Sequence, residues 1–170
     1  VTNNSAGVSL VIAGGGFTVD GQGISGVKPF NIQGGPVTIN NLTITGGNST
    51  AGAGGIYNLR TLTLNNCTVT GNSAATVGGG IRNIGNLRLN NSTISGNTAG
   101  TGGGIYVEGG SASLDSVTVA DNIATTGGGI AQVAGTVTLA NTIVGNNSAS
   151  GSGPDLSGTI TSADHNLVED

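Results

Sequence analysis

Apolar and polar residues alternate along most of this chain, and the alternating runs return at a regular interval. Between Asn86 and Asn90 a single arginine separates Leu87 from Leu89, and equivalent runs occur about 25 residues before and after. The equivalent apolar positions are Val37, Leu62, Leu87, Ala112 and Val137; Ile39, Leu64, Leu89, Leu114 and Leu139; and Ile44, Val69, Ile94, Val119 and Val144. Alternation with a period of two predicts strands with one apolar face. Recurrence in the twenties predicts a solenoid, whose coils bury their apolar faces against one another.

Each repeat contains three segments with the pattern of a short strand: Gly-Gly-Ile, Val/Leu-x-Leu and Thr-Val/Ile. Stacking of coils about 4.8 Å apart would place like aliphatic side chains in ladders that fill a narrow interior. We therefore predict an all-β fold, a right-handed parallel β-helix of about six coils of about 25 residues. Residues 30–150 form the regular repeats, residues 1–29 an irregular N-terminal coil, and residues 151–170 a partial C-terminal coil and tail.

Asparagine and glycine recur at the expected turns. One series consists of Asn72, Asn97, Asn122 and Asn147, and a second consists of the pairs Asn40-Asn41, Asn65-Asn66 and Asn90-Asn91. Asparagine tolerates a left-handed backbone, and its amide can bond the same amide one coil away. Glycine triplets admit corners where side chains would clash between coils. We predict that these residues form structural ladders.

The repeat resembles that of a known family. Gly78-Gly79-Gly80-Ile81, followed by a strand that ends in Ile94-Ser95-Gly96-Asn97, is similar to the GGAI and FxxN repeats of polymorphic outer-membrane proteins. Related repeats occur in large bacterial surface and secreted proteins, and the likeness covers about residues 30–150. Aliphatic residues replace the aromatic of FxxN here. The resemblance implies export, surface exposure and adhesion or structural display, and it supplies no catalytic residues.

The charge pattern narrows the function. The formal net charge is −4, and charged residues make up only 7% of the chain. Residues 1–85 carry Lys28, Arg60 and Arg82 against one acid, whereas residues 86–170 carry one arginine against seven acids. The four basic residues form no cluster in the sequence that could bind nucleic acid. No apolar run approaches the ~20 residues of a membrane span. We expect neither a nucleic-acid partner nor a membrane span.

We predict that the chain is not an enzyme, and we expect no catalytic, cofactor-binding or metal site. Carboxylates that hydrolyse glycosides lie ~5 to 9 Å apart, whereas Asp115 and Asp121 lie at opposite ends of one predicted strand, about 20 Å apart. Asp155, Asp164 and His165 lie in the unrepeated tail, where a solvated turn is expected. With one histidine, a His-based metal site is not expected.

The single cysteine, Cys67, occupies the position of Leu42, Ser92, Val117 and Thr142 in the other repeats. Alternation directs this position toward the interior. We therefore expect a buried, unreactive thiol and no disulfide framework.

Two outward surfaces could make contacts. Tyr57, Arg82 and Tyr106 follow equivalent isoleucines and should stack on successive coils, which would allow cation–π contacts and a patch for a surface glycan or a neighbouring protein. Threonine pairs separated by one residue form rows of the kind that binds ice, at Thr43 and Thr45, Thr68 and Thr70, and Thr93 and Ser95. The second row stops at Ala120, and the first stops at Ile143.

The ends of such a solenoid expose unpaired strand edges, which natural proteins cover. We expect Val8, Leu10 and Ile12 at one edge, and Ile160, Leu167 and nearby acids at the other. Positive and negative halves would favour head-to-tail contact, which forms a filament when it does not close. The function predicted first is a structural solenoid that self-assembles, located outside the cell or on its surface after removal of a signal peptide. An adhesin or display segment of a longer exported protein is the alternative, and an ice-binding protein is a lesser one.

Overall fold

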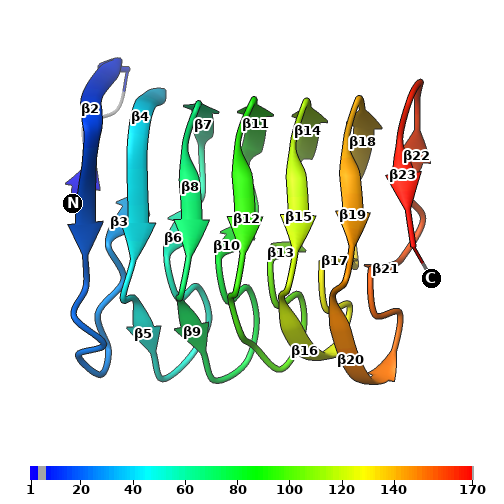
Figure 1. Cartoon of the computed structure of the whole chain (residues 1–170). Helices are drawn as coiled ribbons and strands as arrows, with labels where there is room; N and C mark the ends of the chain where they lie inside the picture. The colour runs from blue at the N-terminus through cyan, green and yellow to red at the C-terminus, as the bar shows by residue number, and fades with distance from the viewer. Residues whose placement is uncertain (4–6, 170) are drawn as a thin grey trace.

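The chain forms a parallel β-helix of about six coils, as the periodicity predicts, in a computed structural model that describes residues 1–3 and 7–169. Within these ranges the regular structure consists of strands only. Figure 1 shows the strands side by side in chain order, with the first and last coils at opposite ends of the stack. All pairs of named strands are parallel, so their hydrogen bonds run along the solenoid axis.

One sheet runs the length of the solenoid on a single side. Its strands, in spatial order, are β1 (Thr2–Asn3), β3 (Phe30–Ile32), β6 (Ile56–Asn58), β10 (Ile81–Asn83), β13 (Ile105–Val107), β17 (Ile130–Gln132) and β21 (Leu156–Ser157). The Gly-Gly-Ile segments supply most of these strands. Ile81 pairs with Ile56 on one side and with Ile105 on the other, so like residues stack on like.

The other two predicted strands of each coil join into one bent sheet, because β4 (Val37–Thr45) runs through both. The first row contains β7 (Thr61–Asn65), β11 (Asn86–Asn90), β14 (Ser111–Asp115), β18 (Thr136–Ala140) and β22 (Thr161–Ser162). The second row contains β8 (Thr68–Thr70), β12 (Thr93–Ser95), β15 (Thr118–Ala120), β19 (Ile143–Gly145) and β23 (Leu167–Val168). In the N-terminal segment, β2 (Leu10–Asp20) pairs along β4.

The structure adds a fourth segment to the three predicted strands. Its members are β5 (Asn48–Ser49), β9 (Ser73–Ala74), β16 (Ile123–Thr126) and β20 (Ser148–Ser152). Isolated bridges through Thr98 connect β9 to β16. The inward residues here are alanines such as Ala74 and Ala124, so the hydrophobic signal in the sequence is weak.

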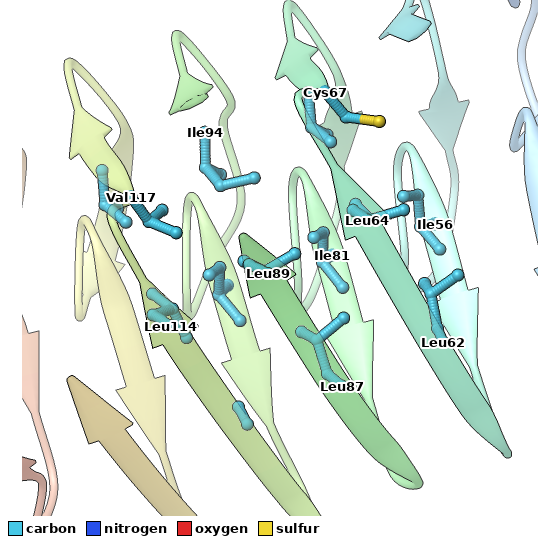
Figure 2. Packing of buried hydrophobic residues seen from close by; sticks show 14 of the residues in the cluster. Ile56, Leu62, Leu64, Cys67, Ile81, Leu87, Leu89, Ile94, Leu114 and Val117 are labelled. Atoms are coloured by element: carbon cyan, nitrogen blue, oxygen red, sulfur yellow. The ribbon is translucent and has the colours of Figure 1, made fainter. Parts of the chain in front are cut away.

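The interior is a stack of aliphatic ladders. Ile56, Leu62 and Leu64 are fully buried, and so are their equivalents Ile81 and Leu89 one coil further. Figure 2 shows these side chains directed inward from facing strands, with each residue beside its counterpart in the next coil. Since every coil repeats the same inward positions, one continuous core runs through the regular coils.

The corners need residues that accept a left-handed backbone or lack a side chain. At the corner between the two rows of the bent sheet, Asn41, Asn66 and Asn91 have φ of 52°, 52° and 46°. At another corner, a Cβ added to Gly79 would lie 2.4 Å from the carbonyl oxygen of Gly103. The predicted roles of asparagine and glycine at the turns are therefore confirmed.

Candidate functional site: the ends and the asparagine spine

The N-terminal end of the solenoid leaves the apolar interior open. Leu10 is 37% exposed, whereas Val37, its partner in the next coil, is 1% exposed. Phe17 is 76% exposed, whereas its partner Leu42 is 5% exposed. Among the described residues, β2 pairs only with β4, and the expected edge residue Ile12 is half-buried against the core. Val8, the third expected edge residue, is 58% exposed.

A glycine bulge divides this edge into two pairing segments. The register between β2 and β4 shifts between Ala13 and Phe17, around Gly14, Gly15 and Gly16. Gly15 and Gly16 have φ of 58° and 84°. A bulge in an edge strand interrupts the flat row of backbone groups that another strand could pair with. Any partner of this edge must pair with the segments before and after the bulge separately.

At the C-terminal end, Ile160 and Val168 pack partly buried against the core. Leu167, the other residue expected at this edge, pairs with Ile143 in an outward column, and the two are 56% and 47% exposed. The last coil has one extra residue at the corner between β22 and β23, so alternation directs Val168 inward. Asp170, the last of the expected acids, lies outside the described residues.

The charges at the two ends are not complementary everywhere. Asp20 pairs with Thr45 at the N-terminal end, and Glu169 lies beside Gly145 at the C-terminal end. Both acids belong to one outward column, so head-to-tail stacking brings like charges together there. The two halves of the chain have net charges of opposite sign, but this column has an acid at each end.

Asparagine side chains form a buried spine through the regular coils. Asn72, Asn97 and Asn122 are each at most 1% exposed. Oδ1 of Asn97 accepts hydrogen bonds from the backbone N–H of Asn72 at 3.1 Å and from its Nδ2 at 3.0 Å. Asn122 and Asn147 repeat this arrangement toward the C-terminus. The predicted ladder is therefore present in the regular coils.

The spine ends on a carboxylate that the sequence analysis placed wrongly. Asp155 is 3% exposed, so the expected solvated turn is incorrect for this residue, whereas Asp164 and His165 are exposed. Oδ1 of Asp155 accepts from the N–H of Asn147 at 3.1 Å and from its Nδ2 at 2.7 Å. Asp155 occupies the position that Gly129 has in the preceding coil. A Cβ added to Gly129 would lie 2.8 Å from the amide nitrogen of Asn147. Where the spine stops, this space is free and the Asp155 side chain fills it.

The expected column of Tyr57, Arg82 and Tyr106 is in register across three coils. The Arg82 guanidinium lies 5.2 Å from the ring centroid of Tyr57 and forms an ion pair with Glu108 at 2.6 Å. Lys28 also approaches Tyr57, with its Nζ 5.5 Å from the centroid of that ring. The cation of this patch is therefore already paired within the chain.

The outward threonine row is longer than the sequence analysis expected. Thr18, in the N-terminal coil, pairs with Thr43, and the row continues through Thr68, Thr93 and Thr118. It ends where Ile143 pairs with Thr118. The second row ends earlier, at Ala120, as expected.

Asp115 and Asp121 serve separate hydrogen bonds between coils. Asn141 donates its amide to Asp115 at 3.0 Å, and this bond, together with the Ser116 hydroxyl, lowers the pKa of the Asp115 carboxyl. Asp121 accepts the amide of Asn146. Each carboxylate thus continues an outer row: the preceding coil has Asn90 at the position of Asp115 and Gly96 at that of Asp121.

Cys67 is buried, as expected, with 2% exposure. Its thiol lies 3.4 Å from the carbonyl oxygen of Ile39 and 3.3 Å from that of Asn65. Burial raises the pKa of the thiol above its ordinary value of 9.0, because the thiolate would lose its hydration.

We expect the native Cys67 thiol to react with a disulfide reagent at least about a hundredfold more slowly than the same thiol in denaturant. As pH rises, the Cys67 thiol loses its proton first in the unfolded chain, because burial raises the pKa of the thiol in the folded protein. The neutral thiol therefore contributes fully to stability below pH about 9, and this contribution is lost as pH rises toward the folded pKa. Urea unfolding at several pH values measures this loss. The control is Cys67→Ser, which matches Ser92 of the next coil. If Cys67→Ser lost the same amount of stability at alkaline pH, ionisation of the Cys67 thiol would not be the cause of the loss.

No group of three or more His, Cys, Asp or Glu side chains is placed to hold a metal ion among residues 1–3 and 7–169. The described part of the chain also has no helix of the length and apolarity needed to cross a membrane. No protein family, no curated protein and no solved structure matches this chain.

Proposed function

We propose that this protein is an extracellular structural β-solenoid whose ends associate head to tail into a filament. The observation that carries the proposal is the open apolar interior at the N-terminal end, where Leu10 and Phe17 are exposed although their columns are buried in every regular coil. Contiguous exposed apolar surface beside an unpaired strand edge favours association.

A second copy offers a matching surface. In head-to-tail stacking, β22 would continue the row of Leu10 to Ala13, and β23 would continue the row of Phe17 to Asp20. Ile160 and Val168 then extend the same inward columns as Leu10 and Val19. Because Ile160 and Val168 are only partly buried now, both ends would gain apolar burial, at about 25 cal/mol for each Å² removed from water.

Purified protein should form long, thin, uniform fibres in negative-stain electron microscopy as its concentration rises. Leu10→Lys should abolish them, because it places a charge in the inward column at the junction. The matched control is Val11→Lys on the same strand, whose side chain points outward and is 63% exposed. Glu169→Gln should lengthen the fibres by removing the like-charge contact with Asp20.

Monodisperse particles of one chain's mass at every concentration would overturn the proposal. Equal effects of the Leu10 and Val11 substitutions would also contradict it, since only one of these residues faces the proposed junction.

The two alternative functions have less support in the geometry. For an adhesin surface at Tyr57, the neighbouring Arg82 is already paired with Glu108. For ice binding, the outward Thr18–Thr118 row is regular over five coils, but its companion row lacks hydroxyls beyond Ser95.

A further inference from the structure

A depression lies on the side of the solenoid, over the central strands β7, β11 and β14. Its volume is about 340 Å³, and it is lined by Thr61, Thr63, Asn86, Leu87, Arg88, Ser111 and Ser113. This volume is at the small end of ligand pockets and matches one or two sugar rings. The outward side chains here are hydroxyls, one amide and one guanidinium, and no acid is among the lining residues.

Arg88 is the one Lys or Arg residue of residues 86–170, and it has no partner among the residues that the structure describes. Each of the other three basic side chains is engaged: Lys28 over Tyr57, Arg60 through a bond to the Gln33 carbonyl, and Arg82 with Glu108. For Arg88, the described residues provide no hydrogen bond, ion pair or ring contact, and the residue is exposed. Its five N–H groups are therefore available to an anion.

Three of the hydroxyls that line the depression, those of Thr61, Thr63 and Ser113, make no hydrogen bond to the described residues. Ser111 donates to Oδ1 of Asn86 at 3.1 Å, which orients that amide and leaves its NH₂ group free to donate. Thr63 and Ser113 flank Arg88 on the adjacent strands, in register with it and about 4.8 Å away. Donors and acceptors thus surround a single positive charge on a rigid parallel sheet.

We propose that this depression binds a carboxylated sugar, a hexuronate unit of an acidic polysaccharide. The planar carboxylate would accept two parallel hydrogen bonds from the Arg88 guanidinium. The ring hydroxyls would bond to Thr61, Thr63, Asn86 and Ser113. The site lies on the side of the solenoid and is therefore independent of pairing at the ends.

The test is a titration followed by ¹H–¹⁵N NMR, with a tetrasaccharide that contains glucuronate as the probe. The Leu10→Lys background keeps the protein monomeric if it forms fibres. We expect shifts confined to amides of β7, β11 and β14, with an affinity of about 1 mM or tighter. The uncharged methyl ester of the same tetrasaccharide should bind at least about tenfold more weakly, because it cannot form the charge-assisted pair.

Arg88→Gln should weaken binding of the tetrasaccharide at least about tenfold, and Arg88→Lys should weaken it less, because lysine keeps the charge without the planar fork. The matched control is Arg60→Gln, which removes the same charge from an arginine outside the lining and should leave affinity unchanged. Shifts spread over other faces, or equal affinity of the Arg88→Gln variant, would overturn the site. Equal binding of inorganic phosphate would overturn the assignment to a sugar.

Discussion

Replacing Asn97 with alanine should lower the free energy of unfolding by about 3 kcal/mol or more. Asn97 is fully buried in the middle of the spine, and its Nδ2 bonds to the carbonyl oxygens of Val69 at 3.0 Å and Ser95 at 3.1 Å. Its Oδ1 accepts the N–H of Asn72. Alanine removes these partners and leaves buried polar groups of two coils without hydrogen bonds, each costing about 1–3 kcal/mol. Urea unfolding at neutral pH measures the difference.

Two further variants separate the spine from a local effect on the strand. Ser95→Ala changes an outward hydroxyl two residues away and should alter stability by less than about 0.5 kcal/mol. Asp155→Ala removes only the last acceptor of the spine and should have an intermediate effect, since it leaves the backbone N–H of Asn147 unpaired. The Asn147 amide keeps its bonds to the carbonyl oxygens of Val119 and Gly145. If Asn97→Ala were as mild as Ser95→Ala, the spine would not stabilise the stack of coils.

Replacing Gly79 with alanine should destabilise the protein by about 3 kcal/mol, although it adds a single methyl group. The added Cβ would lie 2.4 Å from the carbonyl oxygen of Gly103 and 2.5 Å from that of Thr98. Both contacts are to backbone, so relief requires two hydrogen-bonded coils to move apart at this corner. Thermal and urea unfolding should both report the loss.

The matched control is Gly109→Ala, at another corner of the same solenoid. There the nearest atom to the added Cβ is the Ile84 carbonyl oxygen, at 3.1 Å, and φ lies outside the left-handed region. We expect a change below about 1 kcal/mol. Equal losses in the two variants would show that general backbone entropy, and not the spacing between coils, sets the cost.

The sequence alone determined the architecture, because each coil buries the same positions against neighbours of the same kind. The columns of Leu62, Leu87 and Ile94 alternate with polar residues, and that pattern fits only one orientation of each strand. The corners could be predicted from the sequence for a related reason. Asn66 and Asn91 have a left-handed backbone conformation that few residue types accept.

The tertiary structure decided what happens where the repetition stops. Asp155 is buried because the spine has no further asparagine to occupy that space. This depends on the coil beside Asp155, and the residues next to Asp155 in the sequence do not indicate it. Likewise, one extra residue at the last corner turns Leu167 outward and Val168 inward. Regular repeats impose their pattern on each coil, whereas at the ends contacts form on one side only, so individual geometry determines which side chains are buried and which surface is left open.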